Sequence, residues 1–291
     1  MIYRLWLEHY MLTFKRGKVK GSTLKYYEYR FKSLSPLYDI ELSSLSIFDI
    51  QNLVNALHAA GLSYSTVKGT YSLLEQSLNK AVSCKLISFN PCIGVELPKK
   101  DKHELDSLSE FEVRQLLVCD KRNFYYPVFL FLLHSGLRAG ELIALEWDKI
   151  DFKSGVIHVC NNYYRGELST PKTEQGERDI PLTKSLLNLL PDRSDRRGGL
   201  VFRNSFSCRI DYHILLRSWY RQQESANFKN RYGLHALRHT FATNLIHNGA
   251  DAKTVSLLLG HKDVQTTLNF YCHSSLEEKR KVISLLDYKV F

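Results

Sequence analysis

An arginine and a glutamate stand three positions apart in the segment HSGLRAGEL, a spacing that brings both side chains to one helical face. Arg138 follows a glycine turn and would begin a helix, where exposed N–H groups and the helix dipole favour an anion. Glu141 can brace the Arg138 guanidinium. The pair is therefore consistent with an anion site, and the alternative, which this segment alone favours slightly, is a surface Arg–Glu pair that contributes little.

The segment HALRHTFAT repeats the three-residue spacing with a histidine and an arginine. His235 and Arg238 would lie on one face of a helix, so both could address the same phosphate. His239 adjoins Arg238 and is assigned a supporting role. A helix that buries its apolar side and exposes histidine and arginine also occurs in proteins without catalytic activity, so this alternative stays open.

A lysine stands in the turn between two segments of strand-like composition, within TPKT. Lys172 on a hairpin tip could reach into a cleft and give its proton to a leaving oxygen, provided that nearby cations lower its pKa. Lysines on turns more often serve solubility, and that is the alternative for Lys172.

The segment LGHKDVQTTLNFY combines a glycine that would end one helix with a tyrosine on the next. Gly260 would place His261 in a turn where its imidazole is free to donate. Tyr271 follows ten residues later on the helix that begins near Thr266. Packing or a hydrogen bond is the alternative role for any one of the seventeen tyrosines.

The first hundred residues are predicted to form helices separated by short polar turns, because apolar residues recur there at steps of three and four. The expected helices cover Ile2 to Phe14, Thr23 to Leu37, Ile47 to Ala60 and Tyr64 to Val82. The charged stretch from Pro98 to Asp106 has almost no apolar content and is interpreted as a linker. We therefore predict a helical first domain over 1–97, a linker over 98–106 and a second domain over 107–291.

The second domain should contain helices with a small antiparallel sheet among them. A helix is predicted to begin at Ser109, whose spacing to Glu112 matches a capping box, and helical character continues to Trp147. The pattern is strand-like over Val156 to Tyr164 and over Arg178 to Leu182. After Thr183 the chain is helical almost to its end. The predicted fold class is mainly α, with a mixed α/β second domain.

The charge balance favours a polyanionic partner such as nucleic acid or an acidic membrane surface, because the formal net charge is +10. Residues 1–32 hold eight bases and two acids, and aromatic residues alternate with the bases. This arrangement suits an amphipathic helix that lays cations along phosphates, and a solvated face is the alternative. The candidate DNA-contacting residues of the first domain are Lys18, Lys20, Lys25, Arg30 and Lys68.

Several other protein classes do not fit the sequence. The six cysteines show no C-x-x-C pair and no zinc spacing, so reduced thiols in a cytosolic protein are expected and no metal is predicted. The longest apolar run, Pro127 to Leu133, is far shorter than the roughly 20 residues that span a bilayer. Met1 to Leu12 lacks the apolar stretch of a signal peptide. A bacterial cytoplasmic location without membrane partners is expected.

Taken together, these segments resemble the tyrosine recombinase (phage integrase) family. The resemblance is carried by HSGLRAGEL, TPKTEQGERDIPL, HALRHTFAT and LGHKDVQTTLNFY, which occur in the family's order. It is close over residues 134–273, and the helical first domain resembles the family's core-binding domain more loosely. Several separated motifs in one order are specific, whereas a single one would not be.

The resemblance implies DNA strand breakage and rejoining through a 3′-phosphotyrosine. It assigns Tyr271 as the nucleophile and Arg138 and Arg238 as clamps on the non-bridging oxygens, with His261 donating to the same group. Lys172 would be the general acid for the 5′-oxygen, and His235 would assist proton transfer or orientation. Because the tyrosyl ester conserves bond energy, no cofactor, ATP or metal is expected.

The resemblance also implies partners. They are double-stranded DNA recombination sites, on which a protein that is monomeric when free forms a homotetramer, and it allows for accessory DNA-bending or directionality proteins. Ser274 to Tyr288 could be a C-terminal helix that docks on a neighbouring protomer. A role in a mobile genetic element fits the family, but the sequence does not separate integration from excision, inversion or dimer resolution.

Two alternatives share the same motifs. A type IB topoisomerase uses the same arginine, lysine, histidine and tyrosine chemistry but would relax supercoils without exchanging partners. A catalytically silent DNA-binding protein could keep the same fold, although the complete set of motifs favours an enzyme.

Overall fold

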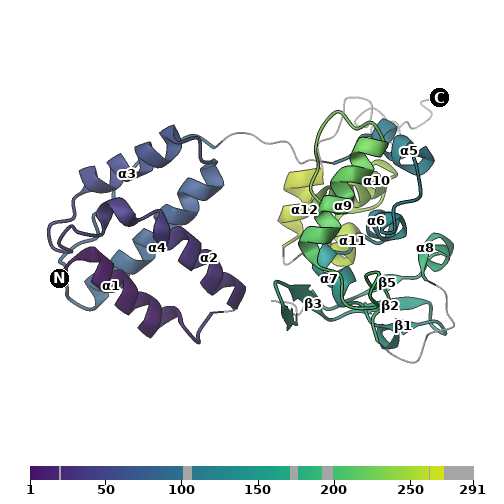
Figure 1. Ribbon diagram of the computed structural model, residues 1–291, viewed down its shortest axis with the longest axis horizontal. Helices are drawn as coiled ribbons and strands as arrows, with labels where there is room; N and C mark the ends of the chain where they lie inside the picture. The colour runs from purple at the N-terminus through teal and green to yellow at the C-terminus, as the bar shows by residue number, and fades with distance from the viewer. Residues whose placement is uncertain (20, 101–106, 171–175, 192–198, 262, 272–291) are drawn as a thin grey trace, which may run out of the picture. The chain divides into compact units, whose positions relative to one another are not determined.

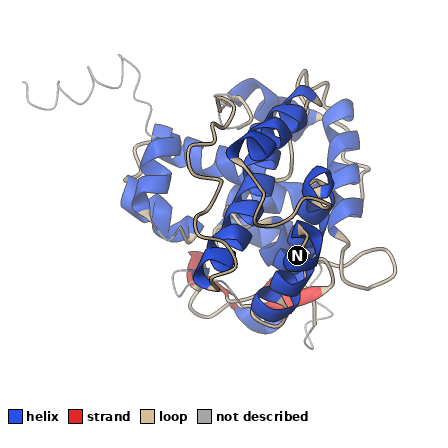
Figure 2. Cartoon of the chain, turned by 90° about the vertical axis from the view of Figure 1, so that its left-hand side faces the viewer, coloured by secondary structure: helices blue, strands red, loops and turns tan. Residues whose placement is uncertain are grey.

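Helices make up most of the protein in the computed structural model (Figures 1 and 2). The structure describes residues 1–19, 21–100, 107–170, 176–191, 199–261 and 263–271. The chain divides into two compact units, Met1–His103 and Glu104–Phe291. The division falls within the stretch interpreted as a linker. The predicted mainly α fold class is confirmed.

The first unit is a helical domain around one apolar core. Its helices are α1 (Tyr3–Tyr10), which continues as a π-helix (Met11–Lys15), α2 (Gly21–Lys32), a 3-10 turn (Ser35–Leu37), α3 (Ile47–Ala59) and α4 (Tyr64–Ser83). Trp6, Leu7, Leu53, Leu74 and Leu78 are among the fully or almost fully buried residues of the core. The predicted helical segments all contain helices, with ends that differ by a few residues.

Serine side chains fix the starts of two of these helices. Ser46 accepts the N–H of Asp49, whose carboxylate accepts the N–H of Ser46 in return, so α3 begins with a complete capping box. Ser63 accepts the N–H of Thr66 at the start of α4. Each cap satisfies a donor that the first turn of a helix leaves without a partner.

The second unit combines helices with two small antiparallel sheets. Its helices are α5 (Glu110–Val118), α6 (Tyr126–Ser135), α7 (Ala139–Ala144), a 3-10 turn (Trp147–Lys149), α8 (Lys184–Leu189), α9 (Tyr212–Ser225), α10 (His235–His247), α11 (Ala252–Leu259) and α12 (Val264–Tyr271). Its strands are β1 (Ile150–Asp151), β2 (Val156–Val159), β3 (Asn162–Tyr164), β4 (Glu167–Ser169) and β5 (Arg178–Pro181). Strands β1, β2 and β5 form one sheet and β3 pairs with β4.

The strand-like stretch predicted over Val156 to Tyr164 forms two strands and not one continuous strand. The structure divides it into β2, which pairs with β5, and β3, which turns back through a two-residue hairpin onto β4. The hairpin residues Arg165 and Gly166 both have positive φ, 51° and 89°, as the tight turns that match strand twist require. The helix predicted to reach Trp147 likewise ends at Ala144, and a 3-10 turn follows.

The core of the second unit centres on α6, whose apolar side chains are buried almost all round. Phe129 packs against Trp219 of α9 with ring centroids 5.0 Å apart, and α6 also contacts α8 and α10. The predicted capping box at Ser109 and Glu112 is present at the start of α5. No helix in the part of the chain that the structure describes is long and apolar enough to cross a membrane.

Candidate active site

A turn at Gly136, which has a left-handed backbone conformation, positions Arg138 at the start of α7. Gly136 ends α6 with φ +65°, and a Cβ at this position would collide with the Phe241 ring of α10. Two residues later Arg138 is the N-cap residue of α7. Glu141 lies in the first turn of this helix, so the backbone fixes the position of both charged residues.

Arg138 and Glu141 form the interaction that their spacing predicts. Nη1 of Arg138 donates to Oε1 of Glu141 at 2.6 Å, and the backbone N–H of Arg138 donates to Oε2 at 2.8 Å. The Glu141 side chain is 3% exposed, whereas that of Arg138 is 38% exposed. Arg138 therefore keeps solvent access while its inner edge is held by a buried carboxylate, so the pair is more than a surface ion pair.

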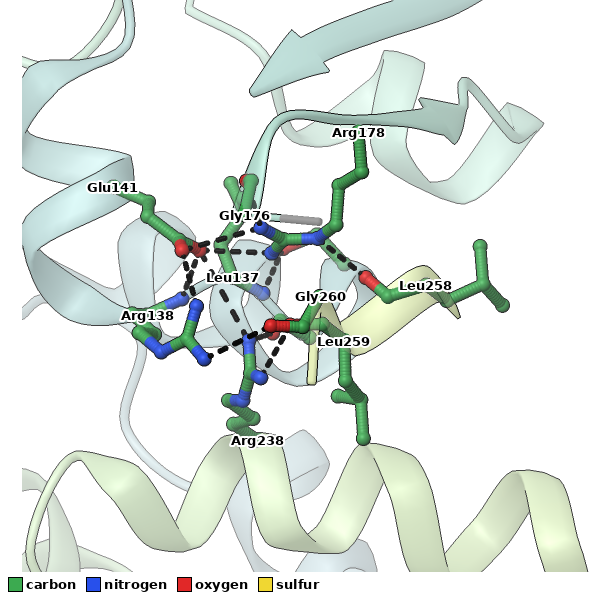
Figure 3. A network of polar contacts seen from close by, with 11 residues as sticks. Leu137, Arg138, Glu141, Gly176, Arg178, Arg238, Leu258, Leu259 and Gly260 are labelled. Atoms are coloured by element: carbon green, nitrogen blue, oxygen red, sulfur yellow. Dashed lines mark hydrogen bonds and ion pairs between the residues drawn. The ribbon is translucent and has the colours of Figure 1, made fainter. Parts of the chain in front are cut away.

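Two further guanidinium groups converge on the same carboxylate (Figure 3). Arg178, the first residue of β5, donates through Nη2 to Oε2 of Glu141 at 2.8 Å and through Nη1 to Oε1 at 3.2 Å. Nη1 of Arg238, from α10, lies 4.0 Å from Oε2. Arg238 also donates from Nη1 to the Gly136 carbonyl at 2.9 Å and from Nη2 to the Leu259 carbonyl. Three cations from three elements thus surround one anion.

Glu141 is ionised over the whole physiological pH range. Burial of the carboxyl group favours the neutral acid, but the hydrogen bonds and charge of Arg178 outweigh this effect, helped by the charges of Arg138 and Arg238. Together they lower the pKa of Glu141 to about 2. Three guanidinium charges against one carboxylate leave the cluster with a net charge of +2, which favours an incoming anion.

His235 and His239 lie on the same turn of α10 as Arg238. Their rings meet edge to face with centroids 4.6 Å apart. Burial lowers the pKa of His235 to about 4, and the neighbouring His239, Arg238 and Arg138 act in the same direction. His235 is therefore a neutral imidazole near pH 7, able to accept a proton or to donate a hydrogen bond according to its tautomer.

His261 follows directly after the left-handed Gly260 that ends α11 with φ +63°. Burial and the charges of Arg238 and Arg138 lower the pKa of His261 to about 4. Its Nδ1 lies 2.9 Å from Oγ1 of Thr267, a fully buried residue of α12. If the threonine hydroxyl donates to Nδ1, the proton resides on Nε2, and His261 presents a neutral N–H donor.

The remaining two predicted catalytic residues are only partly placed. Tyr271 is the last residue of α12, four residues after Thr267 and so on the same helical face, but its side chain lies outside the described part of the structure. Lys172 lies outside the described residues, between the end of β4 and the start of β5. The structure brings together the other four predicted catalytic residues and both supporting residues.

A family model matches this part of the chain. The model described as "Phage integrase family" matches residues 102–278, more than half of the sequence. The chain belongs to the phage integrase family. The matched range contains all six predicted catalytic residues.

Two similar relatives in this family are named as tyrosine recombinases. The "Tyrosine recombinase XerC-like" protein of Caldanaerobacter subterraneus subsp. tengcongensis is 28% identical, covering 92% of this chain and 78% of the relative. The "Tyrosine recombinase XerD" of Shewanella oneidensis is 32% identical, covering 69% of this chain and 68% of the relative.

Solved structures of integrases share the fold. The Tn1549 transposon integrase in complex with a circular intermediate DNA has a TM-score of 0.83 at 23% identity, covering 98% of this chain and 99% of that chain. A lambda integrase tetramer bound to a Holliday junction has a TM-score of 0.76 at 18% identity, covering 91% and 76%. At these identities the likeness establishes the integrase fold.

The predicted DNA-contacting residues of the first unit differ in accessibility. Lys18, Lys25 and Lys68 are exposed, as phosphate contacts must be, and Lys20 lies outside the described residues. Arg30 is only 9% exposed, and its guanidinium lies over the Tyr26 ring at 4.9 Å. Its Nε and Nη1 atoms are buried without a hydrogen-bond partner in the structure. Of the described candidates, Arg30 thus has the least access to a phosphate.

The sequence interpretation did not single out two members of the site, Arg178 and Thr267. Arg178 begins the second predicted strand, where an arginine has no local feature that distinguishes it from a solvated base. Its contacts reach Glu141 and Leu258, which are 37 and 80 residues away. Thr267 lies four residues before the predicted nucleophile, and this spacing, which places both residues on one side of a helix, could have identified Thr267 from the sequence. No cluster of three or more metal-ligating residues occurs among the described residues.

Proposed function

We propose that this member of the phage integrase family is a site-specific DNA recombinase that cleaves and rejoins strands through a 3′-phosphotyrosine at Tyr271. The observation that carries the proposal is the cluster of Arg138, Arg178 and Arg238 around Glu141. Its excess of positive charge lies beside His261, whose hydrogen bond leads to the helix that ends at Tyr271. Such a cluster suits one phosphodiester group, on which negative charge grows during displacement.

In the cleavage step, the phenolic oxygen of Tyr271 forms a bond to the scissile phosphorus while the bond to the 5′-oxygen breaks. The phenol has an ordinary pKa of about 10 and must lose its proton as it attacks. His235, neutral at pH 7, is the candidate that assists this transfer. Lys172 gives a proton to the departing 5′-oxygen. The products are a 3′-phosphotyrosine and a free 5′-hydroxyl.

The arginines and His261 stabilise the pentavalent transition state. Arg138 offers its solvent-accessible edge to the non-bridging oxygens, and Arg238 adds a fixed buried charge from α10. The Nε2 atom of His261 donates to the same group in the tautomer that Thr267 favours. Arginine suits this role because its planar fork stays charged and matches the geometry of phosphate oxygens.

Rejoining is the same displacement in reverse, with a 5′-hydroxyl as the nucleophile and Tyr271 as the leaving group. The tyrosyl phosphodiester replaces one phosphodiester by another, so the energy of the broken bond is retained. Strand exchange follows when the attacking 5′-hydroxyl belongs to a different DNA duplex. Neither a nucleotide nor a metal is assigned a role in this sequence of steps.

The proposed assembly places four protomers on two double-stranded DNA sites. The fold shared with the lambda integrase tetramer bound to a Holliday junction supports it. Residues 1–97 would bind DNA through Lys18, Lys25 and Lys68 with Lys20 and Arg30, residues 98–106 would link the domains, and residues 107–291 would carry catalysis. The predicted docking helix, Ser274 to Tyr288, lies outside the described residues. Partner proteins that bend DNA or set direction stay a prediction.

Covalent capture tests this proposal without knowledge of the target sequence. Purified protein is first used to select binding sequences from a random duplex library, and these are rebuilt as nicked substrates that lose the 5′-hydroxyl fragment after cleavage. Denaturing gels then show whether protein is joined to DNA. Wild type and the control Tyr220→Phe, on α9, should form the adduct, and Tyr271→Phe should not. An adduct that persists in Tyr271→Phe would remove Tyr271 from the mechanism.

A second substrate separates recombination from simple relaxation. Two selected sites on one linear DNA should yield recombinant products of new length when wild-type protein is added. If the protein relaxes a supercoiled plasmid but never yields recombinants, it acts as a topoisomerase of type IB. If it binds the sites and forms no adduct at all, it is a DNA-binding protein without the proposed chemistry.

A further inference from the structure

We infer that Arg178 is a positioning residue of this active site, holding Glu141 and the His261 turn so that Arg138 remains available to the phosphate. The inference rests on the proposed function and adds a residue to it. Arg178 comes from β5, and only 5% of its side chain is exposed, compared with 38% for Arg138. A guanidinium so enclosed acts on the substrate through its neighbours.

The hydrogen bonds of Arg178 connect three separate parts of the chain (Figure 3). Nη1 and Nη2 hold Glu141 of α7, as described above. Nε donates to the Leu258 carbonyl of α11 at 2.6 Å, and Nη1 also donates to the Gly176 carbonyl at 3.3 Å. One planar group thus fixes α7, the end of α11 and the residue that follows the segment containing Lys172. Arginine alone has enough donors in a rigid fork for this task.

The carboxylate of Glu141 depends on Arg178 for half of its hydrogen bonds. Four hydrogen bonds occupy its two oxygens, two from Arg138 and two from Arg178. A carboxylate has about four acceptor positions, so the set is complete. Without Arg178, the buried carboxylate would replace the lost hydrogen bonds with closer contacts to Arg138 and Arg238. Those are the two groups that the proposed mechanism needs for the phosphate.

At the end of α11, as at Glu141, Arg178 satisfies acceptors that would otherwise compete for Arg138. Three successive carbonyls at this terminus, those of Leu258, Leu259 and Gly260, accept from Arg178, Arg238 and Arg138 respectively. A helix carboxyl end carries partial negative charge and unsatisfied carbonyls, so it is well suited to bind cations. The contact of Arg178 is short and that of Arg138 is long, 3.5 Å. Arg178 therefore anchors the turn that presents His261, whereas the contact of Arg138 with this turn is weak.

The test compares Arg178→Met, Arg178→Lys and the double variant Glu141→Gln/Arg178→Met in the full-length protein. Methionine keeps the length of the apolar stem and removes every donor. The matched control is Arg209→Met, because Arg209 also donates to a backbone carbonyl, that of Ile143, and pairs with a glutamate outside the cluster. Each protein is assayed for DNA affinity, single-turnover cleavage of the nicked substrate, and folded fraction at the assay temperature.

Arg178→Met should reduce the single-turnover cleavage rate by roughly 10²-fold at saturating DNA, because a catalytic group displaced by about 1 Å has a cost of this order. DNA affinity should stay within a few fold. Adding Glu141→Gln should recover about tenfold, since it removes the uncompensated carboxylate that captures Arg138. Arg178→Lys should lie between, because an ammonium can pair with Glu141 but cannot reach all the carbonyls. Arg209→Met should cleave like wild type.

A second readout does not depend on cleavage. The titration midpoint of the His261 imidazole, followed by NMR, should rise in Arg178→Met, because the turn that keeps the imidazole buried beside Arg238 and Arg138 loosens and the smaller contribution of the Arg178 charge is lost as well. It should not change in Arg209→Met. If Arg178→Met cleaves within twofold of wild type, or if its midpoint is unchanged, the inference is wrong. If wild type forms no adduct, the proposed function fails, while the NMR result still decides whether Arg178 holds the turn.

Discussion

Replacing Glu141 by glutamine should expose how much of the stability of the second unit depends on one carboxylate. Glutamine keeps the size of the side chain and one carbonyl acceptor, but it removes the negative charge among Arg138, Arg178 and Arg238. Because these arginines would then face one another without an anion, the loss should exceed that of an ordinary polar substitution. The expected effect can be derived from the pKa of the group.

The pKa of Glu141 falls from an ordinary value of 4.5 to about 2 in the folded protein. Each pKa unit corresponds to about 1.4 kcal/mol, so the ionised carboxylate contributes about 3 kcal/mol to folding at neutral pH. A lowered folded pKa means that the unfolded chain takes up the proton first. The contribution is therefore complete above about pH 4.5 and is lost as the pH falls towards 2.

Urea unfolding at a series of pH values between 3 and 7 measures this contribution. A Trp6→Phe background leaves Trp147 and Trp219, both in the second unit, as the fluorescent reporters. Glu141→Gln should be less stable than its parent by about 3 kcal/mol at pH 7, and the difference should shrink as the pH falls.

Glu112→Gln is the matched control for a buried glutamate, because Glu112 accepts hydrogen bonds from Ser109 and Tyr232, which carry no formal charge. Glu112→Gln retains Glu141, so the stability of this variant should still include the contribution of Glu141 that is lost at low pH. A gap between Glu141→Gln and its parent that stays constant from pH 7 to pH 3 would refute the reasoning, since Glu141 would then have the same pKa in the folded and the unfolded chain.

The remaining predictions concern the two glycine turns and the His261 contact. Gly136→Ala should lower the free energy of unfolding by about 1–3 kcal/mol, because alanine meets both a left-handed φ and the Phe241 ring. Gly155→Ala, with φ +70° but open space, should cost less, and equal losses by urea unfolding would contradict the role of the ring. The His261 imidazole should titrate near pH 4 by NMR, so that its protonation destabilises the fold as the pH falls below about 6.5. Thr267→Val should slow single-turnover cleavage by about tenfold without loss of DNA affinity, and an unchanged rate would dismiss the Thr267 contact as packing.

The local parts of the fold and site could be predicted from the sequence. Helix starts at Ser46 and Ser109 depend on contacts three residues along the chain, and so does the Arg138–Glu141 pair. A spacing of three or four fixes such contacts whatever the rest of the protein does. The turn after Gly260 belongs to the same class, because glycine is the residue that tolerates left-handed backbone there.

The parts that depend on distant contacts could not be predicted. The sequence alone does not reveal that Arg178 meets Leu258, because that contact exists only when β5 lies against α11. The hairpin at Arg165 was missed for a related reason. Strand-like residues continue to Tyr164 on the far side of Asn161 and Asn162, and the hairpin turn itself is signalled only by the single Gly166 that follows. Backbone pairing, rather than residue preference, decides where β2 ends and β3 begins.

The cluster can hold more positive than negative charge because two helices end at it. Gly136 closes α6 and Gly260 closes α11, and the carbonyls at both ends accept hydrogen bonds from arginines. The partial negative charges of these helix ends supplement the single carboxylate of Glu141, so burial of Arg238 and Arg178 is tolerated. The carbonyl groups at these helix ends accept hydrogen bonds from the arginine N–H groups but do not neutralise a full positive charge. The net charge of +2 therefore stays in place before any phosphate arrives, and it is equal in magnitude and opposite in sign to the two negative charges that a phosphodiester attacked by a phenolate would carry in the pentavalent transition state. In the proposed mechanism the ground-state diester carries only one negative charge, so this arrangement would favour the transition state over the substrate, as catalysis requires.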